Sequence, residues 1–239
     1  MAIQINATDI HLRSSQSMGL LATNPFSVTT WINTVWNPGT CNSYVGIYGP
    51  ATDTPLDTPV TAVQIGTVNG TGDVTCWTWG GGTLVGSATG VMTAYNNLWV
   101  NITYTFDGTN HVLYRNGVQL ATATTAQQAG YLNQVYINGY PGGGAAEVAS
   151  AQVDQYCLYG RTLSAGEVQT IYYAAGNRHG IVRSVIAAYE FDEAGQGVTT
   201  TSCVDNSGSG NTLTSTGAGT AITYTYPGTV ANSNIRPVQ

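Results

Sequence analysis

The chain has 239 residues and a net charge of −6, and only 8% of its residues are charged, against about 25% in a typical soluble domain. It contains no lysine and no cluster of basic residues, so a nucleic-acid-binding surface is not expected. No apolar stretch approaches the roughly 20 residues that a membrane-spanning helix needs, and we expect no membrane insertion. Neutral polar residues in place of charges are more typical of an extracellular or particle-bound protein than of a cytosolic enzyme.

The sequence carries few signals of its cellular compartment. Residues 1–6 show neither the basic n-region nor the apolar h-region of a signal peptide, so none is expected. Such a start fits a virion protein assembled in the host cytoplasm and equally a trimmed module. The cysteines stand singly, without the paired spacing of a zinc site. Free thiols that pack as small hydrophobic side chains, and one or two disulfides, both remain open for Cys41, Cys76, Cys157 and Cys203.

Strand patterns fill the first 90 residues. Apolar and polar residues alternate over 3–5 and 10–12, and residues 25–32 are rich in β-branched and aromatic side chains. Between residues 37 and 90, glycine and proline separate several short strands. We interpret these as long hairpins and loops at one end of a β-sandwich.

Residues 98–122 give the clearest pattern. The apolar residues of the first strand fall on one face and alternate with polar ones: Val100, Ile102, Tyr104 and Phe106. The dipeptides at 107–108 and 116–117, Asp-Gly and Asn-Gly, supply the positive φ angles that tight hairpin turns require. The pattern predicts a three-stranded antiparallel meander.

The sequence predicts one helix. Ser164 is a suitable N-cap, and Glu167 three residues later completes a capping box. Val168 and Ile171 have helical spacing, and Gly176 suits the C-terminal end. We therefore expect one short helix in an otherwise β-stranded chain.

Three segments together carry a family resemblance. The first is 26–32, which contains Trp31, and the second is 98–117, which contains Trp99 and the pattern Tyr-Arg-Asn-Gly. The third is 153–168, a strand followed by the capped helix. In this order, over about residues 1–176, they resemble laminin-G-like domains of the concanavalin A-like lectin/glucanase superfamily. The resemblance implies an all-β, two-sheet antiparallel jelly-roll sandwich with one short helix, in which the two tryptophans are structural.

The end of the chain resembles the beginning of such a domain. Residues 189–193 and 205–211 look like its opening, although here they come last. We expect a circularly permuted sandwich, and a truncated second copy is the alternative. The chain is then one domain, 1–239, in which 180–239 contribute a C-terminal strand and an extension. Residues 186–192 lying outside the sheet formed by the first 176 residues would exclude the permutation.

Some relatives of this kind hydrolyse glycosides with paired carboxylates. In the glucanase-like branch, three acids in the pattern Glu-x-Asp-x-x-Glu share one face of a strand. Glu190 and Asp192 begin this pattern, but Gly195 stands at the third acidic position. The three histidines form neither a metal pair nor a partner for a nucleophile. We therefore expect no enzymatic activity, and a glycoside hydrolase is the remaining alternative.

Calcium is the one metal that the sequence suggests. Asp205, Ser207, Ser209 and Asn211 place oxygen donors at alternate positions, and Gly210 allows a sharp bend. Only one of these ligands is charged and no bidentate glutamate follows, so a hydrogen-bonded Asx-turn explains the segment as well. No other cofactor is expected.

Aromatic residues are the candidates for ligand or partner contacts. Exposed tryptophan and tyrosine rings stack on sugars or anchor protein interfaces. The candidates in or near the Gly-rich region are Trp36, Trp77, Trp79, Tyr44, Tyr48 and Tyr140. Burial under long loops is the alternative interpretation of the same residues.

The expected function follows from the untargeted start, the low charge and the lack of catalytic groups. We expect a non-enzymatic structural or adhesion module, a bacteriophage virion surface protein such as a capsid decoration, cement or fibre component, with host glycans as further ligands. It would form a homo-oligomer, with a trimer as our expectation, and would contact other virion proteins. The alternative is a secreted or cell-surface carbohydrate-binding lectin module.

Overall fold

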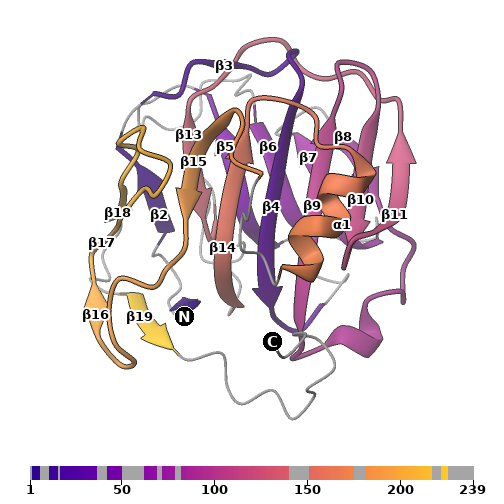
Figure 1. The fold of residues 1–239 in the computed structure, drawn as a ribbon. Coiled ribbons are helices and arrows are strands. Elements are labelled where there is room, and N and C mark those ends of the chain that lie inside the picture. The colour runs from indigo at the N-terminus through magenta and orange to yellow at the C-terminus, as the bar shows by residue number, and fades with distance from the viewer. Residues whose placement is uncertain are drawn as a thin grey trace.

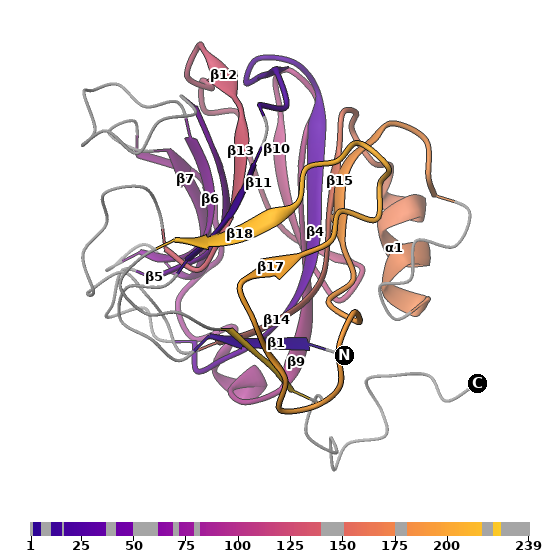
Figure 2. The same ribbon diagram turned by 90° about the vertical axis from the view of Figure 1, so that its left-hand side faces the viewer.

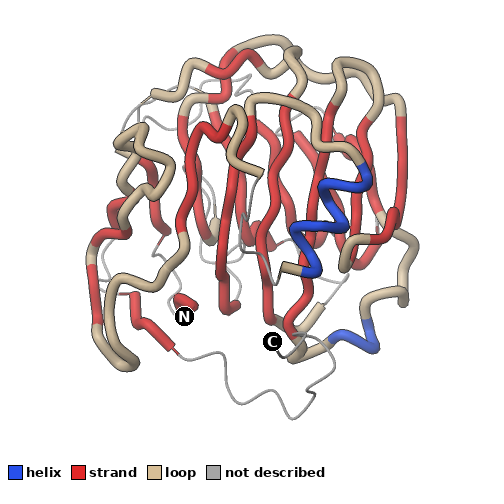
Figure 3. Tube along the Cα trace, viewed as in Figure 1, coloured by secondary structure: helices blue, strands red, loops and turns tan. Residues whose placement is uncertain are grey.

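The computed structural model describes residues 2–5, 11–15, 17–36, 42–49, 62–68, 72–78, 82–139, 151–174, 181–216 and 222–225. Within them the chain forms two large antiparallel sheets packed face to face, with one α-helix on the outside of one sheet (Figures 1 and 2). Strands dominate the regular structure (Figure 3). The predicted all-β, two-sheet antiparallel sandwich with one short helix is confirmed. No helix in this part of the chain is long and apolar enough to cross a membrane.

One sheet, here called sheet A, has nine strands in the described residues. They are β1 (Ala2–Ile5), β4 (Phe26–Asn33), β9 (Trp99–Phe106), β10 (His111–Arg115), β11 (Val118–Ala123), β14 (Ala151–Tyr159), β15 (Val185–Tyr189), β16 (Thr199–Thr200) and β19 (Ile222–Thr225). Their order is β11-β10-β9-β4-β14-β1-β19-β16. The long strand β14 carries two partners along the edge away from β4: β1 pairs with residues 151–153 and β15 with residues 156–159.

The second sheet, sheet B, has eight strands in the described residues. They are β2 (His11–Ser14), β5 (Asn42–Tyr48), β6 (Ala62–Val68), β7 (Gly72–Thr78), β8 (Gly82–Gly86), β13 (Gln134–Ile137), β17 (Ser202–Cys203) and β18 (Leu213–Thr216). Their order is β17-β18-β2-β13-β5-β6-β7-β8. The short strands β3 (Leu20–Leu21) and β12 (Tyr131–Leu132) pair separately, and the helical elements are the 3₁₀ turn η1 (Thr93–Tyr95) and α1 (Ala165–Tyr173).

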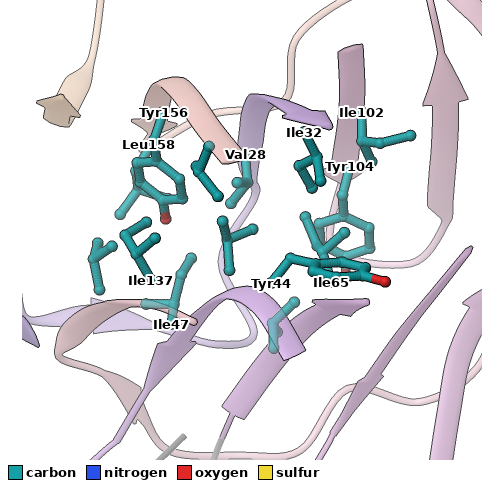
Figure 4. Packing of buried hydrophobic residues seen from close by; sticks show 14 of the residues in the cluster. Val28, Ile32, Tyr44, Ile47, Ile65, Ile102, Tyr104, Ile137, Tyr156 and Leu158 are labelled. Carbon is teal, nitrogen blue, oxygen red and sulfur yellow. The ribbon is translucent and has the colours of Figure 1, made fainter. Parts of the chain in front are cut away.

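The main core lies between the two sheets (Figure 4). Alternate residues of each strand point inward, because successive side chains of a strand leave opposite faces. Sheet A contributes Val28, Ile32, Ile102, Tyr104, Tyr156 and Leu158, and sheet B contributes Tyr44, Ile47, Ile65 and Ile137; all are at most 2% exposed. Each large apolar side chain buried in this way stabilises the fold by about 1.5–3 kcal/mol.

The predicted meander is formed by β9, β10 and β11. The inward-facing residues of β9 are those expected from the alternation, and all four are buried in the core. In the first turn, Asp107 Oδ1 accepts hydrogen bonds from the amides of Thr109 (2.8 Å) and Asn110 (2.7 Å). In the second, Asn116 (φ +51°) and Gly117 (φ +77°) both adopt the left-handed region that a tight hairpin turn requires.

The predicted helix is α1, and its capping box is confirmed. Ser164 Oγ accepts a hydrogen bond from the Glu167 amide (3.3 Å), and Glu167 Oε2 accepts one from the Ser164 amide (2.8 Å). Val168 and Ile171 pack against Tyr159 on the outer face of sheet A. The helix ends at Tyr173 with Ala174 as its C-cap, and Gly176 lies outside the described residues.

The last part of the chain adds strands to both sheets. β15 pairs with β14 inside sheet A, so the observation that would exclude a circular permutation does not hold. β16 and β19 extend sheet A next to β1, whereas β17 and β18 extend sheet B next to β2.

The short strands and hairpins expected between residues 37 and 90 are present in the described part, but their placement among loops at one end of the sandwich was wrong. β5, β6, β7 and β8 are consecutive neighbours that form half of sheet B. The pattern misled because glycines occupy strand interiors here, where they usually indicate a break. Gly66 is such a position, inside β6.

Candidate functional site

A row of side chains crosses the outer face of sheet B, the face turned away from sheet A. Strand pairing places Tyr136 of β13 opposite Gly46 of β5, Gly46 opposite Gln64 of β6, and Gln64 opposite Trp77 of β7. Their strand neighbours, among them Val135, Ile47, Ile65 and Cys76, belong to the core between the sheets. The row therefore points outward, and we call it the outer row of sheet B.

The two glycines in these strands make room for aromatic rings. A Cβ atom at Gly46 would lie 2.6 Å from Cε2 of Tyr48. A Cβ at Gly66 would lie 1.8 Å from the carbonyl oxygen of Asn42 and 2.9 Å from Cη2 of Trp77. Distances under 3 Å leave no space for a side chain, so the rings of Tyr48 and Trp77 lie against bare backbone.

Tyr48 is also fixed by its neighbours in the outer row. Its ring meets that of Tyr136 edge-on, with centroids 4.9 Å apart and an interplanar angle of 74°. Its hydroxyl donates to the carbonyl of Gly139 (3.3 Å) and lies 3.3 Å from Ser43 Oγ. These contacts hold an aromatic pair in one orientation, as a stacking platform requires.

Gln64 is the unusual member of the outer row. Its side chain is fully buried, and within the part of the chain that the structure describes neither Nε2 nor Oε1 has a hydrogen-bond partner. A buried amide without partners costs about 1–3 kcal/mol per unpaired group, and native proteins keep few such groups. The carboxamide lies between Trp77 on one neighbouring strand and Gly46 on the other.

The structure divides the aromatic candidates from the sequence. Tyr48 (1% exposed) and Trp77 (8%) lie in or beside the outer row, whereas Trp36 and Tyr44 belong to the core between the sheets, where their rings meet edge-on at 5.4 Å. Burial also raises the pKa of the Tyr44 phenol. All four are buried: Tyr44 and Tyr48 lie in β5 and Trp77 in β7, whereas Trp36 follows the end of β4. Trp79 and Tyr140 lie outside the described residues.

The segment expected to resemble a calcium loop is closed by its own hydrogen bonds. Asp205 Oδ1 accepts from the amides of Ala188 (3.0 Å) and Ser207 (2.9 Å). Oδ2 accepts from Ser207 Oγ (2.8 Å) and the amide of Asn211 (2.9 Å). The Asn211 side chain donates to the carbonyl of Ile186 (3.1 Å), and the amide of Ser209 donates to Ser207 Oγ (3.1 Å). The geometry is that of an Asx-turn that anchors the loop to β15.

The carboxylates of the described residues are not gathered into one site. Within these residues, no three or more histidine, cysteine or acidic side chains come together in a way that could hold a metal ion. The Glu-x-Asp pair at 190 and 192 lies beyond the end of β15, where Phe191 adopts a φ of +53°. Glu193 accepts hydrogen bonds from the Val204 amide (3.0 Å) and the Tyr224 hydroxyl (2.8 Å), which ties this turn to β17 and β19.

Two members of the outer row were missed by the sequence interpretation. Gln64 and Tyr136 drew no attention because each stands singly in a short apolar strand. The signal that could have found them is the alternation in Val63–Ile65 and Val135–Ile137. It places Gln64 and Tyr136 on the face opposite the core.

Comparisons with known proteins agree with this fold. The model of the concanavalin A-like lectin/glucanases superfamily matches residues 6–169. A candidate carbohydrate-binding protein from Bacteroides ovatus has 12% identity and a TM-score of 0.61, with 93% of this chain and 58% of that chain covered. The native heptameric SAP-like pentraxin from Limulus polyphemus has 16% identity and a TM-score of 0.51, with 95% and 94% covered.

At these identities the two structures show a shared fold alone, and this chain spans little more than half of the Bacteroides protein. The comparison with curated proteins found no match. The family match covers well over half of the sequence, in the order of strands that the structure shows. The chain therefore belongs to the concanavalin A-like lectin/glucanase superfamily.

Proposed function

We propose that this protein is a non-catalytic carbohydrate-binding module and that it binds a saccharide at the outer row of sheet B. The observation that carries the proposal is the Gln64 carboxamide, which is buried and, within the described residues, has no hydrogen-bond partner, on a strand position next to Trp77. The superfamily contains lectins, and the Bacteroides ovatus protein of similar fold is named for carbohydrate binding.

The chemistry of the outer row suits a sugar. A saccharide presents an apolar ring face, which stacks on aromatic rings such as Trp77 and Tyr48, and hydroxyl groups, which both donate and accept hydrogen bonds. The Gln64 carboxamide donates from Nε2 and accepts at Oε1. A bound sugar hydroxyl would therefore recover the hydrogen bonds that Gln64 lacks in the free protein.

Access is part of the proposal. Gln64 and Trp77 are at most 8% exposed, so a saccharide reaches them only after a conformational change that uncovers this face. Association that requires such a change is slow relative to simple encounter. We expect stopped-flow traces, followed by tryptophan fluorescence, whose observed rate levels off at high saccharide concentration.

We also propose that the module is not an enzyme. Several carboxylates of the described residues already accept hydrogen bonds that stabilise turns, a helix cap and a loop. Asp73 accepts hydrogen bonds from the amides of Gly90 (2.8 Å) and Met92 (2.5 Å). Asp107 closes a turn, Glu167 caps α1, and Asp205 holds its loop. A hydrolase needs one carboxyl group as acid and a second as base or nucleophile, and side chains committed in this way are poorly placed for either role.

The test is a glycan array followed by calorimetry on any saccharide that binds. Gln64→Leu removes the carboxamide at nearly constant volume, and Gln119→Leu is the matched control on the exposed strand β11. We expect Gln64→Leu to weaken binding at least tenfold while its melting temperature stays at or above that of the wild type. Silence of the wild type across the array, or equal binding by both variants, would overturn the proposal.

The virion surface role expected from the sequence gains no support from the comparisons, which favour the lectin alternative. An extracellular or cell-surface location and a homo-oligomeric state, for which a trimer is our expectation, stay predictions. Light scattering of the purified protein distinguishes one copy from three.

A further inference from the structure

A second group of side chains lies where β10 of sheet A ends beside η1. Arg115 is the last residue of β10, and its Cζ atom lies 4.4 Å from the centroid of the Tyr95 ring. Both side chains are half-buried. This contact places the guanidinium over the face of an aromatic ring, a position that arginine favours because its guanidinium is weakly hydrated.

Arg115 is fixed by its neighbours, and no ion pair to it is formed within the described residues. Nη1 donates to the carbonyl of Val91 (2.8 Å) and lies 4.0 Å from the sulfur of Met92. Within the described residues no carboxylate pairs with this guanidinium, in contrast to Arg161, which binds Glu167. In the part of the chain that the structure describes, both contacts involve Nη1, so the edge formed by Nε and Nη2 keeps its donors, in a chain that has only six basic residues.

The surroundings of Arg115 are rigid and aromatic. Tyr172, in the last turn of α1, packs on the turn that follows Arg115: a Cβ atom at Gly117 would lie 3.2 Å from the Tyr172 Cβ. Tyr172 in turn stacks on Trp31, with centroids 5.9 Å apart and an angle of 24°. Side chains anchored in this way lose little freedom when a ligand binds.

We propose that Arg115 and Tyr95 form a binding site for a carboxylate group, carried by an acidic saccharide such as a uronic acid. The Nε and Nη2 edge of a guanidinium matches a carboxylate with two parallel hydrogen bonds. A half-buried cation that no described carboxylate pairs with favours an anionic ligand, which supplies the opposite charge. The assignment of a saccharide rests on the proposed function, whereas the site is separate from the outer row of sheet B.

The test compares two ligands that differ only in the acid. Galacturonic acid trimer and galactose trimer have the same ring, and the first carries a carboxylate where the second carries a hydroxymethyl group. We expect the wild type to bind the acidic trimer at least tenfold more tightly in calorimetry, with the preference weakening as salt is added. Titrations with sodium acetate and with sodium sulfate form the second arm of the test. Binding of either anion without binding of the acidic trimer would show a site for free anions rather than for saccharides.

Variants assign the preference to this site. Arg115→Gln is expected to abolish the preference for the acidic trimer. Arg115→Lys is expected to retain only part of this preference, because an ammonium group lacks the planar pair of donors. Arg183→Gln removes the same charge from an exposed side chain and is the matched control, which should keep the full preference. If Arg115→Gln does not fold, Tyr95→Leu tests the same site by removing the stacking surface.

The outcomes separate the two proposals. Equal affinity for both trimers in the wild type, or an unchanged preference in Arg115→Gln, overturns this inference. Binding of acetate or sulfate without binding of the acidic trimer also overturns it. A preference that survives Gln64→Leu places the acid site apart from the outer row, whereas silence towards all saccharides defeats the proposed function itself.

Discussion

Arg161 and Glu167 form a two-point ion pair at the start of α1: Nη2 lies 2.6 Å from Oε1 and Nη1 lies 2.9 Å from Oε2. The same carboxylate closes the capping box with Ser164. One side chain thus joins the strand-to-helix connection to the first turn of the helix. The hydrogen bonds from Arg161, followed by those from Ser164, lower the pKa of Glu167 to about 2.

Glu167→Gln should destabilise the protein by about 1–2 kcal/mol at neutral pH, because it removes a half-exposed ion pair and weakens a helix cap. The ordinary pKa of Glu167 is 4.5 and the folded value is about 2. The stabilising contribution is therefore complete above pH 4.5 and is lost as the pH falls towards 2. Urea unfolding of both proteins at pH 7 and pH 3 checks this, and a difference that does not shrink in acid would contradict it.

His111 should make the protein less stable in mild acid. Its side chain is fully buried, with Nε2 2.6 Å from the carbonyl of Thr125 and Nδ1 2.7 Å from the Tyr104 hydroxyl. Nε2–H then donates to the Thr125 carbonyl, and Nδ1 accepts from the Tyr104 hydroxyl. This pattern of one donor and one acceptor requires the neutral imidazole ring. Burial lowers the pKa of His111 from 6.5, so the unfolded chain binds the proton first and stability falls as the pH drops below about 6.5.

Tyr104→Phe tests the origin of this pH dependence. Removing the hydroxyl leaves Nδ1 buried without a donor, which should cost about 1–3 kcal/mol at pH 8. The loss of stability between pH 8 and pH 5.5 should become smaller, since the hydrogen bond that favoured the neutral ring is gone. Thermal melts of both proteins across this range measure it, and parallel curves would assign the acid sensitivity to another group.

Gly66→Ala should be among the most damaging small substitutions in sheet B. The added methyl group would overlap the Asn42 carbonyl oxygen and press on Trp77, so we expect a loss of more than about 2 kcal/mol. Gly195→Ala is the control, because no atom lies within 4 Å of its Cβ position, and it should change stability by about 0.5 kcal/mol at most. Equal urea midpoints for the two variants would refute the packing argument.

Asp205→Asn should loosen the loop that follows β17. The carboxylate accepts four hydrogen bonds, and an amide nitrogen in place of one oxygen would oppose two of these donors. We expect a loss of roughly 2–4 kcal/mol, seen as a lower melting temperature. Addition of millimolar calcium should leave the wild-type melting temperature unchanged, since ligand binding to the folded state would raise it. A rise of several degrees would identify the loop as a calcium site.

The amino-acid sequence determined the local features of this protein. The alternation in residues 98–122 gave the inward face of β9, the Asn116–Gly117 pair gave a hairpin turn, and the Ser164–Glu167 pair gave the start of α1. Each of these depends on contacts between residues a few positions apart, which periodicity and capping patterns record directly.

Only the tertiary structure decided which distant residues share a face. Gln64 became a candidate because the pairing of β6 with β5 and β7 sets it between Gly46 and Trp77, and Arg115 because β10 ends beside η1. Gly46 and Gly66 are strand positions where an aromatic ring needs the space. Such relations depend on strand register and on packing across long sequence separations, and no local pattern carries that information.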